Sequence, residues 1–255
     1  MSELDNPTTA GCNLTRRALA ALPLALAGIA AAPFAAAELP ASGGSTRLAL
    51  LIGNAVYPAP HDLPPVHKNI RDLSAALQQR DFKVTAVIDL DPAALRRAIQ
   101  AFAAEAQKAP PDATVLFYFT GHGMQVDAEN LMLGAGIAPN AREDVLLNSS
   151  LHLQRDVVDM LPRRSTGMSI AVVDACRVDL RAALAASDGF NQVEAPSGCL
   201  IVFSTGAGKP AIAPARETDN TFYTASLVKL LQTGADELSF SDLFRLVKLD
   251  VQQTM

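Results

Sequence analysis

The chain has 255 residues, of which 49% are hydrophobic, and this is enough apolar material for one sizeable core. It contains no tryptophan and shows no internal repeat, so a solenoid or a propeller is not expected. The formal net charge is -5 and the basic residues form no block, which argues against a nucleic-acid-binding surface.

Residues 1–37 have the features of a twin-arginine-type signal peptide. Arg16 and Arg17 follow Thr15 and precede an uncharged stretch, residues 18–37, that ends in small side chains of the kind a signal peptidase accepts. We therefore expect a bacterial protein that is exported to the periplasm and has no stable membrane span after the signal is removed. Because residues 18–37 are just long enough to cross a bilayer, an uncleaved membrane anchor is the alternative.

A linker at residues 38–46 is expected to join this signal to a single domain at residues 47–255. Within the domain, apolar runs of strand length alternate with segments whose apolar residues recur at helical spacing. The predicted strands are residues 48–52, 82–88, 115–119, 168–173 and 200–203. The predicted helices include one that contains Ile70 and Leu77, one that begins after Asp91-Pro92, and others near residues 151–161, 222–231 and 239–251.

Continuous apolar strands that alternate with amphipathic helices predict an α/β fold, a mainly parallel sheet with helices on both faces. In such a sheet, catalytic groups collect beyond the carboxyl ends of the strands. Four short segments follow predicted strands directly and should meet at that edge, namely Gly53-Asn54, Thr120-Gly121-His122-Gly123, Asp174-Ala175-Cys176-Arg177 and Ser204-Thr205-Gly206.

His122 and Cys176 are the two residues at this edge with the chemistry of a base and a nucleophile. A thiol reacts as its thiolate, and an imidazole within hydrogen-bond reach takes the proton and later returns it to the leaving amine. The glycines beside His122 allow close backbone approach, and the N–H groups of Gly123 and Cys176 are candidate donors to a developing oxyanion. Of the other cysteines, Cys12 leaves with the signal and Cys199 stands in an apolar run typical of a small buried side chain.

The remaining histidines have no such position. His61, His67 and His152 follow no predicted strand, so solvated positions in a loop or on a helix surface are expected for all three.

From about Arg47 onward the sequence resembles the caspase-like cysteine peptidases, and within them the metacaspases and bacterial relatives more than the animal caspases. The caspase signature is Q-A-C-[RQG]-G with a histidine about 50 residues upstream. Here Ala-Cys-Arg is intact around Cys176 and His122 has the corresponding separation, but Asp174 replaces the glutamine and Val178 the glycine. The other matching segments are LLIGN at residues 50–54 with Tyr57 after it, FYFTGHG at residues 117–123, TGAG at residues 205–208 and NTF at residues 220–222.

The resemblance implies a caspase-like three-layer sandwich and a cysteine endopeptidase that cleaves protein or peptide substrates through an acyl-enzyme formed by a Cys176–His122 dyad. It implies no organic cofactor. Some metacaspases bind calcium, and Asp179 is the candidate for such a site here, but the sequence around it has no recognisable spacing of oxygen ligands, so no metal site is assigned. The alternative function is a non-catalytic caspase-like module that binds peptides or partners, and the sequence carries no signal for an oligomeric state.

The resemblance also indicates a substrate preference. In caspases the residue two before the nucleophile helps to line the primary specificity pocket, which holds an aspartate. Asp174 at this position implies a preference for Arg or Lys instead, and Asp72 is the candidate for a second acidic wall. The alternatives are loop capping for Asp174 and, for Asp72, a first-turn carboxylate favoured by the helix dipole.

Overall fold

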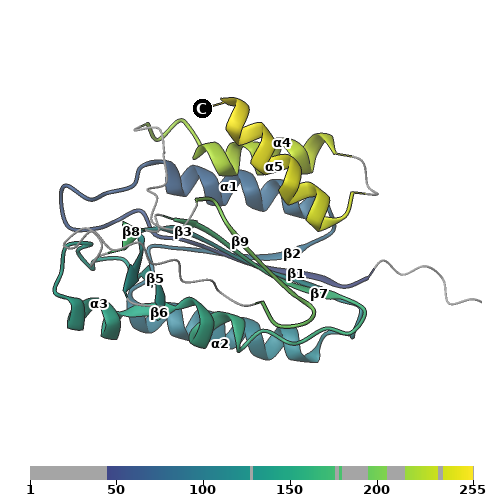
Figure 1. Cartoon of the computed structure of the whole chain (residues 1–255), viewed down its shortest axis with the longest axis horizontal. Helices are drawn as coiled ribbons and strands as arrows, with labels where there is room; N and C mark the ends of the chain where they lie inside the picture. The colour runs from purple at the N-terminus through teal and green to yellow at the C-terminus, as the bar shows by residue number, and fades with distance from the viewer. Residues whose placement is uncertain are drawn as a thin grey trace, which may run out of the picture. The chain divides into compact units, whose positions relative to one another are not determined.

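The centre of the fold is a five-stranded parallel sheet (Figure 1). The structure is a computed structural model that describes residues 45–126, 129–175, 178–179, 195–205, 216–234 and 238–254. The strand order is β2-β1-β3-β7-β9. The strands are β1 (Arg47–Gly53), β2 (Lys83–Ile88), β3 (Thr114–Gly121), β7 (Met168–Ala175) and β9 (Cys199–Phe203).

The inner strands of this sheet are mainly apolar because both of their faces are covered. In β1, Leu48, Leu50 and Ile52 face one hydrophobic core, whereas Ala49 and Leu51 face a second one. The side chains of a strand alternate between the two faces, so a run without polar interruptions supplies both cores at once.

Helices cover the two faces of the sheet. Figure 1 shows α1 (Pro65–Gln78), α4 (Phe222–Thr233) and α5 (Phe240–Thr254) on one side of the sheet and α2 (Pro92–Lys108) on the other. The predicted sheet with helices on both faces is therefore confirmed, and it has the layers of a caspase-like sandwich. Within the described ranges, no helix is both long enough and apolar enough to cross a membrane.

The predicted start of α2 is also confirmed. The Asp91 carboxylate accepts a hydrogen bond from the backbone N–H of Ala94 at 2.7 Å, and Pro92 is the first residue of the helix. Leu95, Ile99 and Phe102 then pack in the core on that face of the sheet.

A second, smaller sheet was not predicted from the sequence. It has the order β6-β5-β4-β8, with β4 (Gly123–Val126), β5 (Glu129–Leu133), β6 (Ser150–His152) and β8 (Val178–Asp179), and α3 (Glu143–Ser149) lies between β5 and β6 in the chain. The predicted helix near residues 151–161 is wrong in its first part, because Ser150–His152 pairs with Leu131–Leu133 as an antiparallel strand and a π-helical turn follows at Leu153–Val158.

Candidate active site

Two of the four predicted segments, Gly53-Asn54 and Thr120-Gly121-His122-Gly123, and the described parts of the other two lie together at the carboxyl edge of the large sheet. Gly121 and Ala175 are register partners at the ends of β3 and β7. The backbone N–H of Asn54 donates to Thr120 O at 3.0 Å, and the Thr205 hydroxyl, just beyond β9, donates to Ala175 O at 3.3 Å.

Cys176 follows this edge directly in the chain. Cys176 and Arg177 lie outside the described residues, so the predicted nucleophile and its backbone donor have no structural description. The structure does place Ala175, which precedes Cys176, beside Gly121, which precedes His122.

The ring of His122 is held by hydrogen bonding at one nitrogen. Its Nε2 lies 2.7 Å from the backbone carbonyl oxygen of His61. A carbonyl oxygen can only accept a hydrogen bond, so Nε2 carries the proton and Nδ1 of the neutral ring has a free lone pair. This tautomer leaves Nδ1 as the atom that can take a proton from a neighbouring group.

Tyr57 fixes both the backbone and the ring of His122. The Tyr57 hydroxyl accepts a hydrogen bond from the His122 backbone N–H at 3.1 Å and donates to Leu133 O at 3.3 Å. The two rings meet edge to face, with their centroids 4.5 Å apart. Burial raises the pKa of Tyr57 above its ordinary value, so the phenol keeps the proton that it donates.

Gly121 allows this close approach. A Cβ atom at this position would lie 2.8 Å from the Tyr57 hydroxyl oxygen and 2.9 Å from the ring of Phe119. Both distances are shorter than real side-chain contacts, so the Tyr57–His122 arrangement requires glycine before the histidine.

Burial sets the charge of His122. Its half-buried position lowers the pKa of the imidazole below 6.5, and the hydrogen bond to the His61 carbonyl only partly opposes this effect. The ring is therefore mainly neutral at pH 7, which is the form that a general base needs.

The loop after β1, residues 54–63, carries the two groups that bind the His122 ring and its backbone N–H. The Asn54 side chain is fully buried and joins this loop to its neighbours, since its oxygen accepts from Leu90 N at 2.9 Å and its amide donates to Leu133 O at 2.9 Å. Sequence reasoning missed the part played by His61, because a backbone carbonyl leaves no mark in the sequence. A groove of about 390 Å³ runs beside the loop and is lined by Ala55, Val56, Asp62, Leu63, Pro64, His67, Lys68, Arg71 and Glu217.

The backbone N–H of Gly123 points away from β5. Leu133 N donates to His122 O at 2.9 Å, and the Tyr57 hydroxyl bridges His122 N and Leu133 O, so residues 122 and 133 have the position of a hydrogen-bonded antiparallel pair. The next pair, Gly123 and Met132, is then of the non-hydrogen-bonded kind, in which N–H groups face outward. This N–H is therefore directed to the side of β4 on which β8 lies.

Asp174 is a buried carboxylate surrounded by hydroxyl groups. Its side chain accepts hydrogen bonds from Thr221 Oγ1 at 2.6 Å and Thr224 Oγ1 at 2.8 Å, and the Tyr118 hydroxyl lies 3.3 Å away. Thr221 is the N-cap of α4, so the carboxylate joins the end of β7 to the start of that helix. Among the described residues no cationic side chain is paired with Asp174, although an isolated buried charge is costly.

Asp72 has a different environment from Asp174. It lies in the middle of α1, so the first-turn alternative is wrong. Its carboxylate pairs with Lys68, one turn earlier, and with Arg71. Partial burial raises the pKa of Asp72, but hydrogen bonding to Lys68 opposes this effect, and the resulting pKa is below its ordinary value. Two basic neighbours therefore already balance this charge.

His152 is the one histidine whose predicted position is wrong. It is buried at the end of β6, where Nδ1 lies 3.1 Å from a Glu129 carboxylate oxygen and Nε2 lies 2.8 Å from Leu147 O. His67 is exposed on α1, as expected, and His61 is half-buried in its loop.

No metal site was found where the structure can be described. Within those residues, no group of three or more His, Cys, Asp or Glu side chains could hold an ion. Asp179 contributes its backbone to β8, opposite Gln125. The half-buried Cys199 has a thiol whose pKa is raised by burial, which makes it a poor nucleophile.

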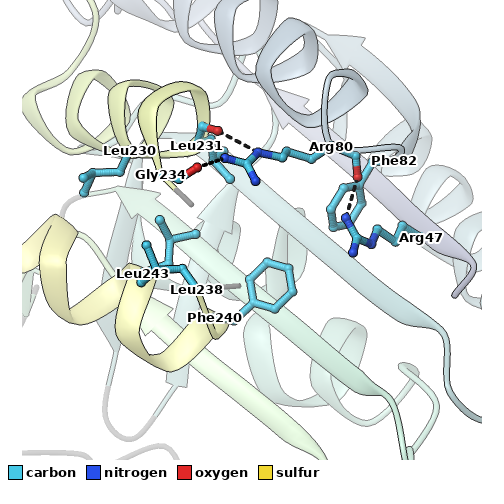
Figure 2. Close-up of a pocket in the computed structure, with 9 residues that line it drawn as sticks. All are labelled: Arg47, Arg80, Phe82, Leu230, Leu231, Gly234, Leu238, Phe240 and Leu243. Atoms are coloured by element: carbon cyan, nitrogen blue, oxygen red, sulfur yellow. Dashed lines mark hydrogen bonds between the residues drawn. The ribbon is translucent and has the colours of Figure 1, made fainter. Parts of the chain in front are cut away.

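A small pocket of about 70 Å³ lies at the opposite edge of the sheet, and its two arginines bind backbone carbonyls (Figure 2). Arg80 donates through Nε to Leu231 O at 2.8 Å and through Nη2 to Gly234 O at 2.5 Å, which satisfies carbonyls at the end of α4. Arg47 donates to Arg80 O at 2.8 Å and its guanidinium lies over the Phe82 ring. The arginines of this pocket thus hold α4 against the start of β1 and the segment before β2.

Comparison with known proteins adds a family and two relatives. The model of a peptidase family, described as "Caspase domain", matches residues 46–255. Mucosa-associated lymphoid tissue lymphoma translocation protein 1 of Homo sapiens is 28% identical over 131 residues, which are 51% of this chain and 15% of that protein. The homolog from Mus musculus matches with the same identity and coverage. The chain therefore spans only a small part of the length of these relatives.

Proposed function

Because the chain belongs to the caspase-domain family, we propose that it is a cysteine endopeptidase in which His122 and Cys176 form the catalytic dyad. Membership of a peptidase family indicates a peptidase-like function in general terms. We propose in addition the identity of the catalytic dyad and the preference for Arg or Lys in the substrate.

The observation that carries the proposal is the state of His122. The bond from Nε2 to the His61 carbonyl leaves Nδ1 as the free basic atom, and burial favours the neutral ring. The residues that precede His122 and Cys176 are register partners, so the chain directs both to one edge of the sheet. A base of suitable tautomer next to a thiol is what nucleophilic catalysis by cysteine requires.

The proposed reaction proceeds through an acyl-enzyme. Nδ1 of His122 takes the thiol proton, and the thiolate sulfur of Cys176 forms a bond to the carbonyl carbon of the substrate. The N–H groups of Gly123 and Cys176 stabilise the negative oxygen of the tetrahedral intermediate. The imidazolium then donates its proton to the leaving amine as the peptide bond breaks, and a water molecule deprotonated by His122 hydrolyses the thioester.

We assign the preference for Arg or Lys to Asp174. Its carboxylate is buried among neutral hydroxyl groups, and no cation in the described part of the chain pairs with it, so a cationic substrate side chain would supply a counter-charge. Asp72, whose charge Lys68 and Arg71 already balance, is the weaker candidate for a second acidic wall.

The function is tested with peptides that release a fluorophore after Arg, Lys or Asp. We expect turnover after Arg and Lys, loss of all turnover in Cys176→Ala, and retention of turnover in the matched variant Cys199→Ala. Iodoacetamide should label Cys176 much faster than Cys199, whose pKa is raised by burial. Equal turnover by Cys176→Ala would remove the mechanism, and turnover after Asp alone would remove the basic preference. Rapid labelling without turnover of any peptide would favour the peptide-binding module.

We also propose that residues 1–37 direct export and that the domain at residues 47–255 acts in the periplasm. The paired Arg16 and Arg17 ahead of an uncharged stretch support this proposal. Fractionation of bacterial cells, with a variant in which both arginines are replaced by lysine, tests it. Periplasmic protein in the variant at the wild-type level would contradict a twin-arginine signal.

A further inference from the structure

We propose that Asp89 is a positioning residue for His122, acting through the loop at residues 54–63. The inference rests on the proposed function in one respect only, namely that His122 is the catalytic base. The carboxylate of Asp89 does not touch His122, but it holds the start of the loop that supplies the hydrogen bonds to the His122 ring and to the His122 backbone N–H.

The position of Asp89 is itself fixed by the fold. It follows β2 directly, and its backbone N–H donates to Gly53 O, at the end of β1, at 2.9 Å. Its φ of 52° lies in the left-handed region, which few residues other than glycine, asparagine and aspartate adopt. This conformation turns the side chain back toward the loop after β1.

The carboxylate then binds the backbone of that loop. One oxygen, Oδ1, accepts hydrogen bonds from Ala55 N at 2.7 Å and from Val56 N at 3.0 Å. The other oxygen, Oδ2, lies 2.6 Å from Nε2 of His67. Partial burial raises the pKa of Asp89, but these three hydrogen bonds together outweigh burial and bring the pKa below its ordinary value. The carboxyl is therefore ionised and a strong acceptor at neutral pH.

The hydrogen bonds that Asp89 accepts from Ala55 and Val56 also stabilise the part of the loop that contacts His122. Ala55 O accepts from Leu63 N at 2.9 Å, so the anchored residue also closes the far end of the loop. Between these two points the Tyr57 hydroxyl meets the His122 backbone, and the His61 carbonyl meets the His122 ring. Release of Ala55 and Val56 would therefore loosen both contacts together.

The test measures the tautomer of His122 by nitrogen-15 NMR of the full chain, with His122→Gln to assign the signal, and the kinetics of Arg peptides. Wild type should show the Nε2–H tautomer. Asp89→Ala should show a mixture of tautomers, with kcat reduced by about 100-fold and KM changed by less than about 3-fold, because displaced catalytic groups slow chemistry more than binding. Asp89→Asn keeps the shape and tolerates the left-handed backbone, so its effect should be smaller.

The matched control is Asp81→Ala. Asp81 also has a left-handed backbone, with φ of 61°, but it precedes β2, at the opposite edge of the sheet. This variant should keep both the wild-type tautomer and the wild-type rate, although it suffers the same backbone strain. If Asp89→Ala fails to fold, as judged by circular dichroism, the comparison of Asp89→Asn with Asp81→Asn decides the question.

His67→Ala separates the proposal from its rival, in which His67 and Asp89 form an acid–base pair of their own. Removal of His67 leaves both backbone hydrogen bonds to Asp89, so we expect a smaller loss of rate than in Asp89→Ala and an unchanged His122 tautomer. A wild-type tautomer and rate in Asp89→Ala would overturn the proposal, as would an equal loss of rate in His67→Ala. A wild type without peptidase activity would remove the proposed function, but the tautomer comparison would still decide the role of Asp89.

Discussion

The hydroxyl of Tyr57 lies 3.1 Å from the backbone nitrogen of His122 and accepts its hydrogen bond. The same hydroxyl donates to Leu133 O, so one buried group joins the loop after β1, the end of β3 and β5. The base of the proposed dyad is therefore placed by contacts that come from three parts of the chain.

The first prediction concerns this hydroxyl. Tyr57→Phe keeps the ring packed edge to face against His122 but leaves the His122 N–H without its partner, whereas the Leu133 carbonyl keeps only its hydrogen bond from Asn54. We expect the free energy of unfolding to fall by about 1–3 kcal/mol and kcat to fall as well. Urea denaturation and peptide kinetics measure the two effects, and an unchanged kcat would show that the hydroxyl does not help to position His122.

The second prediction concerns the glycine before the histidine. In Gly121→Ala the new methyl group would overlap the Tyr57 hydroxyl and the Phe119 ring, so Tyr57 must move and the unfolding free energy should fall by about 1–3 kcal/mol. Peptidase activity should be lost with it.

The control for this variant is Gly136→Ala. Gly136 has φ of 81° and nothing within 4 Å of an added Cβ, so alanine there brings backbone strain of about 1–2 kcal/mol without a clash at the site. Activity retained in Gly121→Ala, or lost equally in both folded variants, would contradict the close-approach argument.

The sequence predicts the large sheet well because the information is local. Each buried strand is a continuous apolar run, and the start of α2 is marked by Asp91 and Pro92 in adjacent positions. His122 and the segment before Cys176 could be assigned to one edge from strand ends alone, since parallel strands bring their carboxyl ends together.

The parts that sequence analysis missed depend on partners far apart in the chain. Ser150–His152 forms a strand only because β5 offers it hydrogen bonds, and His152 is buried only because Glu129 and Leu147 supply acceptors for its ring. The His61 carbonyl is likewise available to any residue type. None of these contacts leaves a periodic pattern that could be recognised beforehand.

The third prediction concerns substrate preference. Asp174→Asn removes the buried negative charge but keeps the shape of the side chain among Thr221 and Thr224. We expect kcat/KM for Arg peptides to fall by about 100-fold, which corresponds to about 2.8 kcal/mol. The free energy of unfolding should change much less, because no cation among the described residues loses its partner.

Asp72→Asn is the matched comparison for Asp174→Asn. Its carboxylate is already paired with Lys68 and Arg71, so we expect a smaller effect on cleavage after Arg. An equal effect would identify Asp72 as the second acidic wall. Loss of stability in Asp174→Asn without any change in kcat/KM would instead assign Asp174 to capping of α4.

The fourth prediction concerns pH. Burial lowers the pKa of His122 below 6.5, so an NMR titration of Cys176→Ala, which removes the coupled thiol, should find the midpoint for this ring below that value. Because the neutral ring is the base, kcat/KM of the wild type should fall as the pH drops through the pKa of His122. A midpoint above 6.5 would mean that the His61 hydrogen bond outweighs burial.

The same shift has a consequence for stability, and its sign follows from proton binding. The unfolded chain, with His122 near its ordinary pKa of 6.5, binds a proton at a higher pH than the folded chain does. Stability should therefore decrease as the pH falls from about 6.5 toward the folded-state pKa, where the decrease levels off. His122→Gln lacks this contribution, so urea denaturation of the two proteins between pH 5 and about 7 should show a steeper decline for the one that keeps the histidine. Parallel declines would mean that burial does not perturb this ring.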